Sequence, residues 1–244
     1  MPANTLPSGI HDLFSLADRM LAGLRVHGPW LRIDLERILA EMLRESRETE
    51  GDWNAARARK AVARRRFATA DAALTAWLVK ARLTVMLALG GPWSERWLEA
   101  GFTHRQTNVP KRLAERMELA NRLTAFFARH RELEVPFANV NAAVALATYT
   151  EIVRAELEAR AANGDAKRCL HARDVAEKSL RRQMSCVVTL LSVALRPGDL
   201  RWLDFGLNQP DPDAIEDARR RERKLGAEVI HLLPAAPMRE VASA

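Results

Sequence analysis

The chain has 244 residues, of which 48% are hydrophobic and 28% charged, and it contains two cysteines. This composition excludes a disulfide-stapled mini-protein, a collagen-like chain and a wholly disordered chain. The formal net charge of +7 permits an anionic partner without requiring one. Because Ala, Leu and Arg are abundant and are strong helix formers, we expect an all-α fold.

The first residues, from Met1 to Pro7, lack the basic-then-apolar layout of a secretory signal. Three uncharged stretches are too short for the ~20 residues that cross a bilayer: 83–94, 135–150 and 183–195. Cys169 and Cys186 fall on one predicted helix, about 25 Å apart at ~1.5 Å rise per residue, so they cannot pair. We therefore expect reduced cysteines, no membrane partner and a cytoplasmic location.

A motif of the form P-x3-R-W-L-[DE]-x-G-[FL] occurs twice, at an offset of 105 residues. A second similarity lies upstream, where 6–27 matches 109–130 at an offset of 103. Two matches at nearly equal offsets indicate a tandem duplication. We predict one repeat over 6–108, a second over 109–213, and a short helix with a flexible tail over 214–244.

Each predicted repeat begins with a helix, over 7–26 and 110–130, with Pro in its first turn and a cap at Thr5 or Asn108. Breaks follow at Gly28-Pro29 and Val135-Pro136. A second helix (31–50 and 137–162), a turn (51–52 and 163–165) and a long third helix (53–89 and 166–195) complete each repeat. This plan predicts two antiparallel three-helix bundles of roughly 105 residues with long, coiled-coil-like helices.

The repeated motif predicts a helix corner. Ser94 and Asp199 are expected as N-caps of a short helix, and Gly101 and Gly206 as its left-handed terminus. The motif residues are Pro92, Ser94, Arg96, Trp97, Leu98, Gly101 and Phe102 in the first repeat, and Pro197, Asp199, Arg201, Trp202, Leu203, Gly206 and Leu207 in the second. A structural role is favoured over a ligand-binding Trp-Arg pair, and the two arginines are expected to bond helix carbonyls or a carboxylate.

No catalytic or metal-binding motif is recognisable in the sequence. It lacks HExxH, CxxC, G-x-S-x-G and phosphate-binding glycine motifs, and its single ExxH, Glu228–His231, stands alone. His27 and His130 are repeat-equivalent and end the first helix of each repeat, where a structural role is favoured. We therefore expect neither an enzyme nor a cofactor.

The strongest charge feature is the basic cluster, six basic residues within a segment from Trp53 to Ala70 that has no acidic residue. Its members are Arg57, Arg59, Lys60, Arg64, Arg65 and Arg66. An ordinary solvated helix face, nucleic-acid phosphates and an acidic protein partner are all compatible with this pattern. The second repeat carries a weaker counterpart between Lys167 and Arg182, diluted by Asp174 and Glu177.

The function we predict is a non-enzymatic helical-bundle scaffold or protein-interaction module, with a protein partner or a second protomer. The alternative is a nucleic-acid-associated protein that binds phosphates through the Arg57–Arg66 basic face. In the tail, a helix near 214–225 and an apolar run over 229–233 are expected, the latter docking on the bundle or binding a partner.

Overall fold

The computed structural model describes residues 4–27, 34–103 and 105–210. The described chain is all-helical and contains no strand, which confirms the expected all-α class. Its α-helices are α1 (Ile10–His27), α2 (Leu35–Leu89), α3 (Arg96–Glu99), α4 (Leu113–Arg129), α5 (Ala142–Ala194) and α6 (Arg201–Asp204). Two 3₁₀ turns, η2 (Arg131–Leu133) and η3 (Pro136–Ala138), separate α4 from α5.

The helices follow the order of the sequence similarity, with α1, α2 and α3 matched by α4, α5 and α6. The predicted turns at 51–52 and 163–165 are wrong, because α2 and α5 continue through both segments. Gly inside a helix costs only about 1 kcal/mol relative to Ala, so Gly51 and Gly164 do not suffice to end these helices. The predicted break at Val135-Pro136 is confirmed by the two 3₁₀ turns, while Gly28-Pro29 lies outside the described residues.

The starts of the first helices also differ from the prediction. α1 begins at Ile10 and α4 at Leu113, so Pro7 and Pro110 precede these helices rather than occupying their first turn. The carbonyl oxygens of Pro7 and Ser8 accept hydrogen bonds from the guanidinium of Arg181 on α5, at 2.6 and 3.0 Å. This arginine holds the segment before α1 in a non-helical path.

The chain forms two compact units, and each unit draws on residues from both predicted repeats. Unit 1 comprises 1–49 and 173–244, and unit 2 comprises 50–172. Within the described residues, unit 1 contains α1 and the start of α2 from the first repeat, with the end of α5 and α6 from the second. Unit 2 contains the rest of α2 and α3, together with α4 and the start of α5. These units therefore differ from the ranges 6–108 and 109–213.

The core of unit 1 is a single cluster of buried apolar residues from all four of its helical segments. The fully buried members include Leu13, Met20 and Leu24 of α1, Leu39 of α2, Leu180, Met184 and Leu191 of α5, and Trp202 of α6. Ser46 is buried here as well, and its hydroxyl donates to the carbonyl of Ala176 at 3.1 Å. The buried hydroxyl is therefore satisfied and ties α2 to α5.

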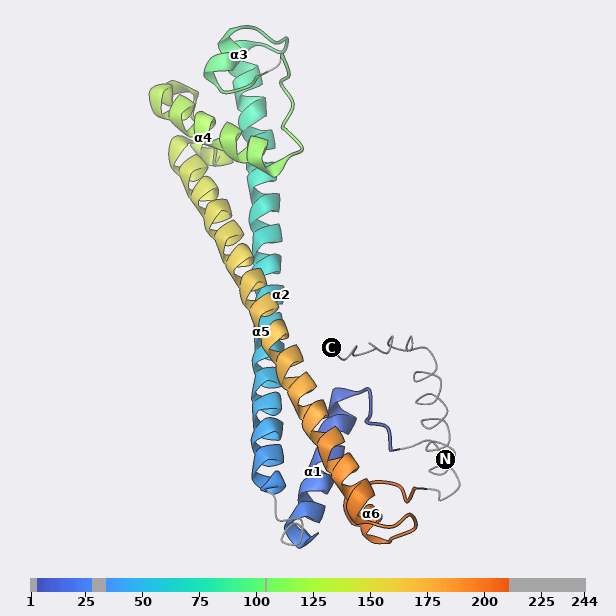
Figure 1. The fold of residues 1–244 in the computed structure, drawn as a ribbon. Helices are drawn as coiled ribbons and strands as arrows, with labels where there is room; N and C mark the ends of the chain where they lie inside the picture. The colour runs from blue at the N-terminus through green and yellow to red at the C-terminus, as the bar shows by residue number, and fades with distance from the viewer. Residues whose placement is uncertain (1–3, 28–33, 104, 211–244) are drawn as a thin grey trace, which may run out of the picture. The chain divides into compact units, whose positions relative to one another are not determined.

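The core of unit 2 is built from the corresponding elements. Its buried residues include Leu74, Leu78 and Val85 of α2, Trp97 of α3, Leu123, Phe126 and Phe127 of α4, and Ile152 and Ala155 of α5. The indole N–H of Trp77 donates to the carbonyl of Asn139 at 3.1 Å. In Figure 1, α4 runs across the end of α2 and the start of α5, and Arg116 of α4 forms an ion pair with Asp71 of α2.

Both cysteines lie on the continuous helix α5, as expected from the sequence, and both are free thiols.

Candidate functional site

The repeated motif forms the same helix terminus in both units. Gly101 and Gly206 have φ values of +94° and +68°, and each follows a one-turn helix, α3 or α6. In α3 the N–H of Phe102 donates to the carbonyl of Trp97 at 3.1 Å, and the N–H of Gly101 donates to that of Leu98 at 3.0 Å. The same two bonds recur after α6, at 3.1 and 2.9 Å. This pair of bonds defines a Schellman motif.

The two corners differ at their N-terminal side. Asp199 accepts from the backbone N–H of Arg201 at 3.0 Å and also binds its guanidinium, and these bonds lower the pKa of Asp199 to about 2. The hydroxyl of Ser94 is buried and has no hydrogen-bond partner in the described part of the chain, so the prediction of Ser94 as a cap is wrong. The indole N–H of Trp202 donates to Arg196 O at 3.2 Å, whereas that of Trp97 has no partner among the described residues.

The glycine that ends each corner packs on the first helix of the other repeat. A Cβ at Gly206 would lie 2.9 Å from Cβ of Arg19 on α1, and one at Gly101 would lie 2.6 Å from Cβ of Arg122 on α4. Arg19 and Arg122 are repeat-equivalent at the offset of 103. At both corners the motif glycine therefore packs against a first helix that belongs to the other predicted repeat. Of the motif residues, Trp97, Gly101, Phe102, Trp202, Gly206 and Leu207 form the Schellman termini, and Asp199 pairs with Arg201.

The two repeat-equivalent histidines each lie beside a carboxylate. His27 Nε2 is 2.8 Å from Asp204 Oδ2 at the end of α6, and His130 Nδ1 is 3.2 Å from Glu132 Oε1. His130 is also the C-cap residue of α4. In both cases the histidine connects the end of a first helix to a neighbouring segment, which is a structural role.

The side chains of the basic cluster project from different sides of α2. Arg66 faces α5, where its guanidinium binds Glu151 and Glu158, each at 2.9 Å. The hydrogen bond to Glu151 raises the pKa of Arg66, and the charges of both glutamates raise it further. Arg66 is thus engaged inside unit 2.

The other five members behave differently. Arg57, Arg59, Arg64 and Arg65 are exposed and Lys60 is half-buried. The guanidinium of Arg57 lies over the ring of Trp53, 5.5 Å from its centre. Within the described residues, none of the five forms an ion pair with a carboxylate. The structure thus separates the five from Arg66, which the sequence had grouped with them.

An apolar groove of about 570 Å³ lies in unit 2, between the end of α2 and the segment 132–140. Its α2 wall includes Leu83 and Leu87, and its other wall includes Val135 and Phe137. Leu87 is 84% exposed and Phe137 is 94% exposed. Large apolar side chains gain free energy when they are removed from water, so their exposure on this surface is unfavourable. This groove was not predicted from the sequence, because a run of uncharged residues does not show which of its sides is covered.

The same part of α2 has the composition of a membrane span. By length and composition alone, α2 includes an 18-residue window with a mean hydropathy of 1.5, and 28% of that window is buried. The window is thus mostly accessible, in keeping with the exposure of Leu83 and Leu87.

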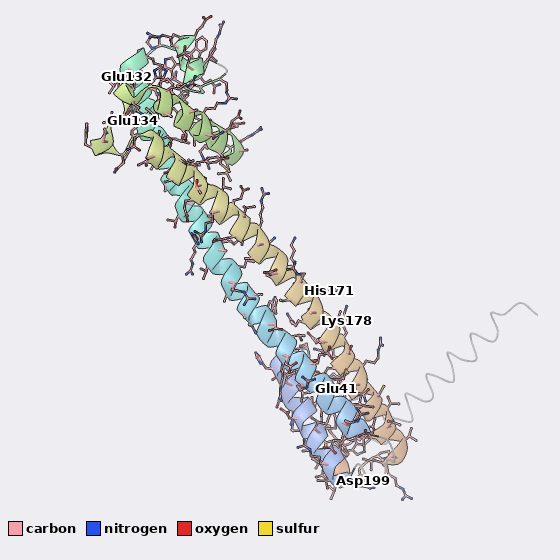
Figure 2. All side chains as sticks on the ribbon, turned by 90° about the vertical axis from the view of Figure 1, so that its left-hand side faces the viewer. Glu41, Glu132, Glu134, His171, Lys178 and Asp199 are labelled. Atoms are coloured by element: carbon pink, nitrogen blue, oxygen red, sulfur yellow. The ribbon has the colours of Figure 1, made fainter. Side chains whose placement is uncertain are left out.

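The rim of the groove carries charges of both signs. Lys80 lines the α2 wall, and Glu132 and Glu134 line the other; Figure 2 shows these two glutamates close together. Glu134 accepts from the backbone N–H of Ala142 at 2.9 Å, which fixes it at the start of α5. The pKa of Glu132 is lowered by a backbone hydrogen bond and by its hydrogen bond with His130, both of which favour the charged carboxylate.

No group of three or more potential metal ligands occurs within the part of the chain that the structure describes. Another hollow of about 570 Å³ lies between the corner of α3 and the start of α4, where Glu118 and Arg122 pair with each other. No family model matches the chain, and comparisons with curated proteins and with solved structures likewise found no match.

Proposed function

We propose that this protein is a non-enzymatic, cytoplasmic helical scaffold that pairs with a second copy of itself through the apolar groove of unit 2. The observation that carries the proposal is the exposure of Leu87 and Phe137, at 84% and 94%, on opposite walls of that groove. Burying a Leu or Phe side chain contributes about 1.5–3 kcal/mol, so covering this surface provides a driving force for association.

The charges on the rim support a second copy as the occupant. Lys80 lies on one wall and Glu132 on the other, so the charge pattern is self-complementary. A two-fold axis that exchanges the walls places each Lys80 near the carboxylates of the other copy. Such isologous contacts are the usual way in which soluble chains form dimers.

Sedimentation equilibrium of the full chain over a concentration series tests this proposal. We expect a monomer–dimer equilibrium that Leu87→Glu and Phe137→Glu each weaken by at least about tenfold, since each substitution puts a charge into the apolar contact. Val193→Glu is the matched control: Val193 is 83% exposed near the end of α5, outside the groove. It should leave the equilibrium unchanged.

Two results would overturn the proposal. One is a monomer at every concentration, and the other is a dimer that Val193→Glu weakens as much as Leu87→Glu does. Flotation of the wild-type chain with neutral lipid vesicles, lost in Leu87→Glu, would instead assign the groove to a membrane surface.

A further inference from the structure

One flank of unit 2 carries a row of basic residues on α2. Trp53, Arg57, Lys60 and Arg64 follow one another at spacings of four, three and four residues, which places them on the same face of a helix. Arg66, two residues after Arg64, points to a different side and binds Glu151 and Glu158 of α5. The row and the neutralised Arg66 therefore lie on opposite flanks.

A second row lies on α5. Arg160 and Lys167 are seven residues apart and share a face with Glu156, while Glu158 belongs to the flank of Arg66. Arg160 is exposed and forms an ion pair with Glu156, and Lys167 is exposed. The basic charge of this row exceeds its single carboxylate.

The two rows lie on the same side of unit 2, because α4 contacts both faces. Arg116 of α4 pairs with Asp71, which is seven residues after Arg64 on the same face of α2. Met117 of α4 lines a hollow together with Glu156 and Arg160 of α5. Arg57, Lys60 and Arg64 of α2, together with Arg160 and Lys167 of α5, form a surface on this side of unit 2. We call this surface the basic flank.

The basic flank has the chemistry of a surface for a polyphosphate backbone. Its five cations outnumber the carboxylates on the same helix faces, which are Glu156, paired with Arg160, Asp71, paired with Arg116, and Glu50. The positive charges are spread along two helices rather than gathered at a point. Arg57 is held over the ring of Trp53, which positions its guanidinium without neutralising it. Guanidinium groups bind phosphate oxygens in a fork, and rows of such contacts give sequence-independent affinity for nucleic acids.

We propose that the basic flank of unit 2 binds the phosphate backbone of a nucleic acid. This inference goes beyond the proposed self-association, which uses a different surface of the same unit. No base-reading element is assigned, so binding is expected to depend strongly on salt and weakly on sequence.

The experiment is fluorescence anisotropy of the full chain with short duplex DNA, duplex RNA and single-stranded RNA, titrated between about 50 and 200 mM salt. Five phosphate contacts predict a slope of log K against log salt of about −4.5 on duplex DNA. The triple variant Arg57→Gln, Lys60→Gln, Arg64→Gln should reduce the magnitude of that slope by about 2.7 and weaken binding at least about tenfold. Comparing the three probes distinguishes DNA from RNA as the source of phosphate.

The control removes the same charge elsewhere. The triple variant Arg131→Gln, Lys178→Gln, Arg182→Gln changes three exposed basic residues outside the basic flank and should keep the wild-type affinity. The variant Arg160→Gln, Lys167→Gln tests the second row alone and should reduce the slope magnitude by about 1.8. Circular dichroism verifies that each variant retains its helix content.

The inference is wrong if the flank triple and the control triple weaken binding equally, or if the wild-type chain does not bind in low salt. Retention on anionic lipid vesicles, without nucleic-acid binding, would also overturn it. Sedimentation of the flank triple keeps the two proposals apart, because its dimer equilibrium should match wild type whether or not nucleic acid binds.

Discussion

Gly23 of α1 lies against the ring of Phe205, which follows α6: a Cβ at Gly23 would come within 2.6 Å of the ring carbon Cδ1. The repeat-equivalent positions in unit 2 are Phe126 and Ala100, both buried. At these aligned positions the two predicted repeats thus carry a large and a small residue in opposite order. A volume-conserving exchange of this kind keeps a core filled.

Replacing Gly23 should therefore destabilise unit 1. We expect Gly23→Ala to lower the free energy of unfolding by about 1–2 kcal/mol, because overpacking outweighs the gain in helix propensity. Combined with Phe205→Ala, the same change should cost less than the sum of the single variants, since the ring no longer blocks the methyl group. Urea denaturation of the four proteins measures this coupling, and strictly additive effects would contradict the contact.

Gly51 offers the opposite case. It lies inside α2, and a Cβ there would meet nothing within 4 Å. Gly51→Ala should raise the free energy of unfolding by about 0.5–1 kcal/mol, because Ala loses less backbone entropy in a helix. A thermal melt followed by circular dichroism measures the change. A loss of stability would contradict the absence of steric contact at this position.

The Schellman glycines combine a left-handed backbone with a close contact, and a comparison of Gly206 with Gly198 separates these two effects. Gly198 has a φ of +82° with open space around it, whereas Gly206 packs on Arg19. Gly198→Ala should cost about 1 kcal/mol through backbone strain alone. Gly206→Ala should cost at least 1 kcal/mol more, because its Cβ would displace Arg19. Equal losses in urea denaturation would show that the packing contact contributes nothing.

Acid should selectively weaken the corner that contains Asp199. Its pKa lies at about 2, below the ordinary value of 3.8, chiefly because Arg201 hydrogen-bonds it. A carboxylate with a lowered pKa contributes stability above pH 4, and that contribution is lost as the pH falls through 2. Asp199→Asn keeps an acceptor for the backbone N–H but removes the charge. The urea midpoints of wild type and variant should therefore differ at pH 6 and converge below pH 2.

Sequence patterns predicted the local features whose causes are local. The Schellman termini at Gly101 and Gly206 follow from a glycine at fixed spacing from a Trp, and the all-helical content follows from composition. The turns at Gly51 and Gly164 were wrong because the cost of one glycine is small compared with the packing along a long helix. The order of the helices along the chain does not show that α6 packs on α1. That contact arises because the start of α2 and the end of α5 belong to the same unit.

The candidate surfaces were only partly predictable for the same reason. The basic cluster was visible in the sequence, but periodicity alone did not reveal that Glu151 and Glu158 neutralise Arg66 while Arg160 and Lys167 extend the row. The exposure of Leu87 and Phe137 depends on the path of the 132–140 segment, which two 3₁₀ turns create. An uncharged sequence gives no information about which side of it is covered.

The composition of the two units sets an order of assembly during synthesis. Unit 2 is one continuous stretch, 50–172, so all of it is available once that stretch has left the ribosome. Unit 1 needs both 1–49 and residues after 172, so its core cannot be completed until the last third of the chain emerges. Unit 1 is therefore the unit whose apolar core residues stay incompletely covered for longer during synthesis.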